Sequence, residues 1–263
     1  MLALLHPGVM GAAVAACLVG RDHQVGWLAT GRSDESTDRA VAAGLTPFDD
    51  QSELLADADV VFSICPPHAA LEVARQLVGY HGIVVDANAV SPNTSRLVGG
   101  VVTAGGARYV DGGIIGPPPL GAGTTRLYLA GDNGEVASLF AGSPLDVVSL
   151  AGAPPAASAL KMTYAAWTKT TAALLISIRR TAAAFGVEDD LTREWAISQP
   201  DLAAAWLRAT QQADEKGWRW SYELAEVGRT FAEVGQPEGF GAAASQIFTA
   251  SVDERPPPDS HGT

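Results

Sequence analysis

Lys161 is the residue whose type and setting point most directly to chemistry. It is a lone cation in the otherwise apolar run 152–166, near the start of a stretch, 158–184, that is rich in good helix formers. A lysine that enters an apolar helix is partly desolvated, which favours its neutral form and suits a general acid or base. The alternative is a lysine whose stem packs while its ammonium reaches solvent. The local pattern alone favours that alternative.

A second candidate site is the turn after the first apolar run, where Gly8 and Gly11 enclose Val9 and Met10. A glycine-rich turn between a strand and a helix lets backbone N–H groups and the helix N-terminus approach a pyrophosphate closely. The pattern is incomplete, because His6 occupies the position of the first glycine in the G-x-G-x-x-G fingerprint. A plain strand-to-helix turn is therefore the alternative to a dinucleotide site.

The end of the second apolar run carries an arginine among small residues. Sites that prefer NAD usually place an acid there for the ribose 2′-hydroxyl, whereas an arginine suits the 2′-phosphate of NADP. We therefore expect Arg32 to select NADP(H); the alternative is a solvated Arg32, with Asp34 or Glu35 on the ribose. The residues expected at this part of the site are Thr30, Gly31, Arg32 and Ser33.

Composition narrows the class of protein. At 263 residues the chain can hold one large domain or two ordinary ones. Its net charge of −12 argues against a nucleic-acid or anionic-membrane surface, so we expect small-molecule partners. Cys17 and Cys65 lie in separate apolar runs and no leader or membrane span is recognisable, which favours a reduced, cytoplasmic protein. The histidines show no ligand spacing, and we predict no metal.

Strand-like runs alternate with helical stretches over the first half of the chain, which predicts an α/β fold with a mostly parallel sheet. The expected strands are 2–5, 24–29, 60–65, 83–86, 108–111, 125–131 and 146–150. One long helix, 158–184, should lead into an all-helical half, with further helices at 191–197, 201–215, 218–234 and 241–252. We expect a Rossmann domain over 1–153, a helical domain over 154–252 and a loose tail over 253–263.

Five ordered segments match a single known pattern. Residues 8–11 are similar to a G-x-M-G turn, and 63–67 to a strand that ends in a proline-bearing loop. Residues 86–92 are similar to D-x-S-T-x-S-P, 111–116 to the substrate loop D-A-P-V-S-G-G, and 152–162 to G-x-x-G-x-G-x-x-x-K. Through these segments the chain resembles the β-hydroxyacid dehydrogenases, which include 3-hydroxyisobutyrate and 6-phosphogluconate dehydrogenases and, more distantly, the imine reductases.

This resemblance implies an NADP(H)-binding Rossmann domain, a helical domain joined to it by the long helix, and a homodimer through the helical domains. It also favours the catalytic interpretation of Lys161 over the solvent-reaching one, and implies that Lys161 donates a proton to a carbonyl oxygen as hydride arrives. Asn88 is expected near the nicotinamide, with capping of a helix as its alternative role. The remaining cofactor contacts expected from the resemblance are Cys65, Pro66 and Pro67.

The chain departs from the family around Lys161. The family's asparagine four residues after the lysine is Ala165, and the serine of the substrate loop corresponds to Ile115. Because oriented hydrogen bonds reject wrong substrates, we expect a bulkier or less polar substrate than a small hydroxy acid. Tyr164 is a second candidate proton donor, with simple packing as its alternative. The candidate substrate contacts are Gly112, Gly113, Ile115, Thr168 and Trp218.

The sequence is compatible with three functions. The first is an NADPH-dependent oxidoreductase that interconverts a carbonyl and a hydroxyl group, with the proton from Lys161. The second is an imine reductase, in which relatives often replace the lysine. The third is a non-catalytic NADP-binding sensor, which the missing first glycine at His6 and the lost asparagine at Ala165 favour.

Overall fold

A computed structural model describes residues 1–253, except for the side chains of Lys216, Trp218 and residues 250–253. Apart from Asp253, the tail expected over 253–263 lies outside the described residues. The chain divides into two compact units, Met1–Lys161 and Met162–Thr263. The division falls inside helix α7 (Ala156–Ala165), whereas the sequence predicts a domain boundary at residue 153.

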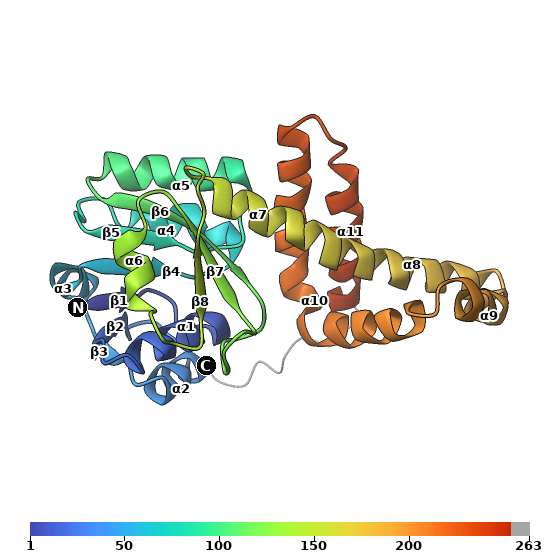
Figure 1. The fold of residues 1–263 in the computed structure, drawn as a ribbon, viewed down its shortest axis with the longest axis horizontal. Helices are drawn as coiled ribbons and strands as arrows, with labels where there is room; N and C mark the ends of the chain where they lie inside the picture. Colours follow the sequence, from blue (N-terminus) through green and yellow to red (C-terminus); the bar gives the residue numbers. More distant parts are fainter. Residues whose placement is uncertain (254–263) are drawn as a thin grey trace. The chain divides into compact units, whose positions relative to one another are not determined.

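An eight-stranded sheet forms the centre of the first unit, in the order β3-β2-β1-β4-β5-β6-β7-β8 (Figure 1). Neighbouring strands are parallel except for β6 and β7, which are antiparallel. The expected α/β fold with a mostly parallel sheet is therefore confirmed. The strands are β1 (Leu2–Leu4), β2 (Val25–Leu28), β3 (Thr46–Phe48), β4 (Val60–Ser63), β5 (Ile83–Asp86), β6 (Arg108–Ile115), β7 (Arg126–Ala130) and β8 (Asp146–Ser149).

Helices cover both faces of this sheet, because successive strand side chains point to opposite faces. Leu2 and Leu4 of β1 join the core under α1, α2 and α6, whereas Ala3 joins the core under α3, α4 and α5. The helices are α1 (Val9–Val19), α2 (Asp34–Ala42), α3 (Gln51–Asp57), α4 (Ala70–Arg75), α5 (Pro92–Ala104) and α6 (Gly134–Leu139), with a 3₁₀ turn η1 (Pro67–Ala69) before α4.

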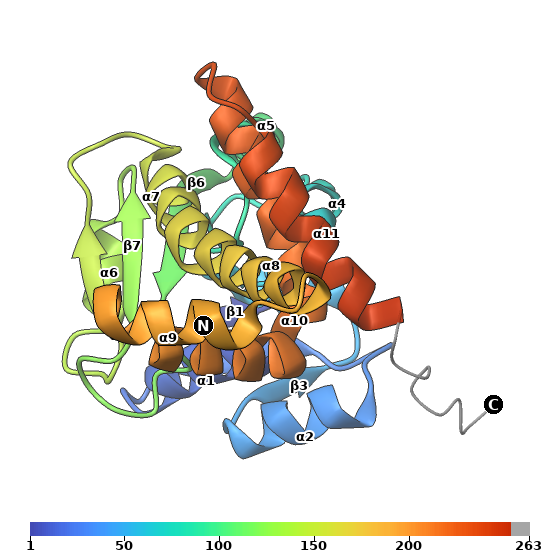
Figure 2. The same ribbon diagram turned by 90° about the vertical axis from the view of Figure 1, so that its right-hand side faces the viewer.

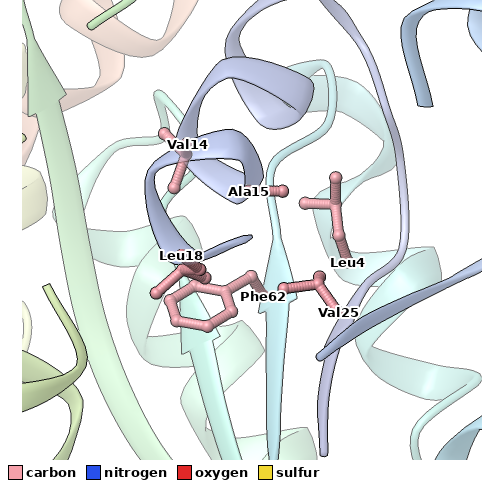
Figure 3. Close-up of a pocket in the computed structure, with 6 residues that line it drawn as sticks. All are labelled: Leu4, Val14, Ala15, Leu18, Val25 and Phe62. Carbon is pink, nitrogen blue, oxygen red and sulfur yellow. The ribbon is translucent and has the colours of Figure 1, made fainter. Parts of the chain in front are cut away.

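Close packing fixes α1 on the sheet. Figure 3 shows the apolar side chains that meet between α1 and strands β1, β2 and β4, and the space among them has no room for a water molecule. This packing fixes the position of the N-terminus of α1 relative to the carboxyl ends of the strands. The six side chains are Leu4, Val14, Ala15, Leu18, Val25 and Phe62.

The segment 111–116, expected from the resemblance to be a substrate loop, is mostly strand. β6 continues to Ile115 because it pairs with β7, from Asp111 opposite Ala130 to Ile115 opposite Arg126. Pairing with a distant strand is a long-range interaction that local sequence does not report. The same holds for the short strand β3, which pairs with β2 and was not among the expected strands.

The second unit is helical, with η2 (Ala166–Thr170), α8 (Thr171–Ala184), α9 (Glu188–Ser198), α10 (Leu202–Glu233) and α11 (Gly239–Asp253). Figure 2 shows α10 and α11 side by side. The two helices expected over 201–215 and 218–234 are one helix, α10. Gly217 lies inside α10 and does not end it; the ring of Phe248 of α11 lies beside this glycine, 3.4 Å from where a Cβ would be.

The long helix expected over 158–184 is helical throughout but not uniform. Its middle, η2, is a π-helical turn between α7 and α8. A π turn widens the spacing of side chains, so the α-helical phase does not carry through from Lys161 to Thr168. Among the described residues, no helix is both long and apolar enough to cross a membrane.

Candidate active site

The turn between β1 and α1 leads into a helix N-terminus that no side chain caps. Gly8 is the N-cap of α1 in an extended conformation, and no side chain caps this helix. The first N–H groups of a helix have no partner within it and carry a partial positive charge. A Cβ added to Gly8 would have no atom within 4 Å, whereas one added to Gly11 would lie 2.4 Å from the carbonyl oxygen of His6. The turn is therefore tight at Gly11 and open at Gly8, which fits a pyrophosphate.

His6 replaces the first glycine of the fingerprint without adding charge. Burial, and then the nearby charge of Arg32, lower the pKa of His6 to about 4. Its Nδ1 is buried and has no hydrogen-bond partner among the described residues. The ring is thus neutral at physiological pH and adds no charge beside the N-terminus of α1.

Two arginines brace this turn from the side of α2. Arg32 donates from Nη2 to the carbonyl oxygen of Leu5 at 3.0 Å and from Nε to that of Leu28 at 3.3 Å. Arg39 donates from Nε to the carbonyl oxygen of Pro7 at 3.1 Å. Burial lowers the pKa of Arg32, but an arginine keeps its charge. Sequence reasoning missed Arg39, although its place on the helix that follows Arg32 was an available signal.

Small residues surround these arginines. Ser33 is the N-cap of α2, with its Oγ accepting from the backbone N–H of Ser36, and Arg39 donates from Nη2 to Ser36 Oγ at 3.0 Å. Thr30 donates from Oγ1 to the carbonyl oxygen of Asp49 at 2.7 Å. Gly31 has a φ of +74°, a conformation that glycine adopts at least cost, and open space beside it. Arg32 and the three residues expected beside it therefore lie in one loop at the end of β2.

The loop after β4 is held by the side chain of Asn88. Its Oδ1 accepts from the backbone N–H of Cys65 at 2.6 Å, and its Nδ2 donates to Ser63 Oγ at 3.1 Å and to Asp86 Oδ1. The alternative role of Asn88 as a helix cap is wrong, since Ser91 caps α5. The side chain of Asn88 orders the segment that leads to Pro66 and Pro67, the first of which is exposed.

Cys65 is not a nucleophile in this setting. Burial, followed by the neighbouring charge of Asp86, raises the pKa of its thiol to about 12. Because the thiolate is the reactive form, this thiol is inert at physiological pH. Cys65 contributes to the site through its backbone and not through its thiol.

Lys161 lies against β6. A Cβ added to Gly113 would lie 3.1 Å from Lys161 Cβ and 2.7 Å from the carbonyl oxygen of Ala157, so α7 crosses the strand where it has no side chain. Gly112, on the opposite face of β6, would meet Ala87 Cβ and the carbonyl oxygen of Asp86 at 3.1 Å. The two glycines serve close packing on opposite faces of the same strand.

The other candidate residues have more varied settings. Ile115 is buried at the end of β6. Tyr164 and Thr168 belong to the second unit; both are exposed, and Thr168 donates from Oγ1 to the carbonyl oxygen of Tyr164 at 3.2 Å. Trp218 lies in α10, and its side chain is outside the described part of the chain. Among the described residues, no group of three or more His, Cys, Asp or Glu could hold a metal ion.

The strand order defines the class of this domain. The chain adds β2 and β3 on one side of β1 and then returns to place β4 on the other, and the uncapped N-terminus of α1 follows β1. Dinucleotides bind at such a reversal of strand order, at the carboxyl ends of the strands. Fold and site together therefore define a dinucleotide-binding domain of the Rossmann type.

Comparison with known proteins identifies the family. Residues 2–139 match the model of the NAD binding domain of 6-phosphogluconate dehydrogenase, and residues 182–251 match a domain of unknown function, DUF1932. The chain belongs to the first of these families, and so to the β-hydroxyacid dehydrogenase superfamily of NAD(P)-dependent oxidoreductases. The family expected from the sequence is confirmed.

A relative from Methanothermus fervidus, an uncharacterized 28.5 kDa protein in the 7S RNA 5′ region, is 31% identical over 165 residues, which are 61% of this chain. The chain spans 62% of the length of that relative.

Two solved structures illustrate the range of the fold. Conserved protein MTH1747, described as similar to 3-hydroxyacid dehydrogenases, is 25% identical with a TM-score of 0.72 over 96% of both chains. A reductive aminase from Aspergillus terreus, in complex with NADPH and ethyl levulinate, is 18% identical with a TM-score of 0.61 over 96% of this chain and 93% of its own.

Proposed function

We propose that the protein is an NADPH-dependent oxidoreductase that interconverts a carbonyl and a hydroxyl group of a small organic molecule. The observation that carries the proposal is the contact of Lys161 with Gly113 at the end of β6 in a domain of the dehydrogenase family. Lys161 is half-buried and lies beside β6, at a point beyond the carboxyl end of the neighbouring strand β5. Dehydrogenases need a proton donor of this kind near the reacting carbon.

The cofactor part of the proposal rests on charge and on open backbone. Gly8, Val9, Met10 and Gly11 would hold the pyrophosphate through the N–H groups of α1. Arg32 and Arg39, with the hydroxyl of Ser33, would hold the 2′-phosphate and so favour NADPH over NADH. The nicotinamide supplies hydride when it is bound. The loop of Cys65, Pro66 and Pro67, ordered by Asn88, would then border the cofactor.

Lys161 would supply the proton. Its part is to donate a proton to the substrate oxygen in reduction and to accept it back in oxidation. Gly112, Gly113 and Ile115 bring no hydrogen-bonding side chain to this part of β6. A substrate with a larger apolar portion would suit such walls better than a small hydroxy acid. Tyr164, Thr168 and Trp218 remain candidates for its contacts, and we propose a homodimer through the helical domain.

Reduction of an imine is the second candidate function. The likeness of the fold to the NADPH-bound reductive aminase and the apolar Ala165 and Ile115 favour it. Purified protein with NADPH should be offered cyclic imines beside 2-keto and 3-keto acids with bulky apolar groups, while loss of NADPH absorbance is followed. Turnover of keto acids supports the first function and turnover of imines alone supports the second. Tight NADPH binding without turnover on the whole panel contradicts both and favours the sensor.

A further inference from the structure

One buried carboxylate ties the start of α7 to β6. Asp111 is fully buried, and its Oδ2 accepts the backbone N–H groups of Ala157 at 2.8 Å and of Ser158 at 3.1 Å. Its Oδ1 accepts from Ser158 Oγ at 2.5 Å. These N–H groups belong to the first turn of α7, where no partner exists within the helix, and a negative charge there is stabilised by the helix dipole. A strand residue 46 positions upstream thus caps the helix that carries Lys161.

The same face of β6 also touches Lys161. Gly113 follows Asp111 by two residues, so both face α7. An added Cβ at Gly113 would reach the carbonyl oxygen of Ala157 and Lys161 Cβ, which lie one helical turn apart. Asp111 therefore fixes the first turn of α7 on the strand, and Gly113 fixes how closely the next turn approaches. Lys161 is the side chain whose position both contacts determine.

Asp111 is held in place independently of α7. Its Oδ1 also accepts from Ser95 Oγ of α5 at 3.0 Å, and Ser95 Oγ lies 2.9 Å from the hydroxyl oxygen of Tyr109. The backbone of Asp111 is paired on one side with β5 and on the other with β7. A carboxylate anchored on three sides can orient a helix rather than follow it.

We propose that Asp111 is a positioning residue for Lys161: through the first turn of α7 it holds the lysine side chain beside β6. This inference rests on the proposed function, in which Lys161 donates the proton. Asparagine at position 111 is almost isosteric, but it carries no charge and has a single acceptor oxygen, so it cannot accept all four of the bonds that Oδ1 and Oδ2 now accept. Asp111→Asn should therefore release the first turn of α7 and with it Lys161.

The test reads the lysine directly. The chain has three lysines, Lys161, Lys169 and Lys216, so methylation with ¹³C-formaldehyde yields few NMR signals, which Lys161→Arg assigns. In the unaltered protein NADPH should move the Lys161 signal. In Asp111→Asn the signal should shift towards that of a solvated lysine and its response to NADPH should fall to less than half. Turnover should drop about 100-fold, as expected for a misplaced catalytic group, while the affinity for NADPH is kept.

A matched control separates positioning from stability. Ser95→Ala removes a donor to Asp111 from the side of α5 and leaves every bond to α7, so it should lower the melting temperature without moving the Lys161 signal. Ser158→Ala, which keeps both backbone bonds, should give a smaller shift in the same direction and serves if Asp111→Asn does not fold.

Two outcomes are decisive. The positioning role is overturned if a folded Asp111→Asn variant leaves both the Lys161 signal and its response to NADPH unchanged. The same result in Ser158→Ala overturns it when that variant has to be used. If NADPH leaves the signal of the unaltered protein unmoved, the proposed function fails instead, and the cofactor-free signals still test Asp111.

Discussion

Asp86 lies directly opposite Asp111 in the register of β5 and β6, and both carboxyl groups are buried. The two differ in their partners. Asp111 accepts bonds from Ala157, Ser158 and Ser95, whereas Oδ2 of Asp86 is buried with no hydrogen-bond partner among the described residues. Burial, with Asp111 as the neighbouring charge, raises the pKa of Asp86 to about 7. Burial raises the pKa of Asp111 too, but the bonds that its carboxylate accepts from Ser158, Ser95 and Ala157 oppose that rise. Asp86, which has fewer such bonds, is therefore the member of the pair that more readily takes up a proton.

This pKa predicts an unusual dependence of stability on pH. In the unfolded chain Asp86 loses its proton near pH 4, whereas in the folded protein it keeps the proton up to about pH 7. The contribution of Asp86 to the free energy of unfolding therefore falls as pH rises through this range and then levels off. At about 1.4 kcal/mol per pKa unit the full cost is roughly 4 kcal/mol. Asp86→Asn should therefore be more stable than the unaltered protein at about pH 8, with a smaller difference at about pH 5.

Urea unfolding at the two pH values measures this difference. Asp38→Asn, at an exposed position of α2, is the matched control and should show no such trend. If the free energies of unfolding of Asp86→Asn and the unaltered protein differ by the same amount at both pH values, the protonation of Asp86 is contradicted.

Gly8 and Gly11 should respond differently to the same added methyl group. Gly8→Ala meets no atom within 4 Å and has a φ of −67°, so the variant should fold with an unchanged melting temperature. Its methyl group would enter the space expected for the pyrophosphate, so NADPH and NADH should both bind at least about 10-fold more weakly, a loss near 1.4 kcal/mol. Gly11→Ala would strike the carbonyl oxygen of His6 and should lose stability as well. Fluorescence titration and thermal unfolding test both; full affinity in Gly8→Ala would remove the pyrophosphate from this turn.

Arg39 should contribute to the choice between the two nicotinamide cofactors. If its guanidinium joins Arg32 at the 2′-phosphate, Arg39→Ala should weaken NADPH binding about 10- to 100-fold, the range for a charge-assisted hydrogen bond, and leave NADH binding nearly unchanged. Arg75→Ala, which removes an exposed arginine paired with Glu72 on α4, is the control. Equal losses for NADPH and NADH would mean that Arg39 only braces Pro7.

Lys161 should matter for turnover and not for cofactor affinity. Lys161→Met keeps most of the apolar stem and removes the proton donor, so turnover on the best substrate of the panel should fall by about 10²- to 10⁴-fold. Lys161→Arg keeps a positive charge that does not readily give up its proton, and should be nearly as slow. Steady-state kinetics and NADPH titration of both variants measure this. Undiminished turnover in Lys161→Met would assign the proton to another group, with Tyr164 the next to test.

The sequence by itself determined the class of fold and the family. Alternating apolar runs and glycine turns predicted the parallel sheet, because strand and helix periods are local properties of the chain. The order of five motifs predicted the family that the match over residues 2–139 confirms. Cofactor and proton-donor candidates followed from residue types, and their roles remain predictions.

Tertiary structure decided what depends on contacts between distant segments. It extended β6 through pairing with β7, placed Gly217 of α10 beside Phe248 of α11, and brought Arg39 to the carbonyl oxygen of Pro7. It also placed Asp111 under the first turn of α7. Such contacts join residues from separate elements of the chain, and their energies arise from burial and hydrogen-bond geometry that no local pattern encodes.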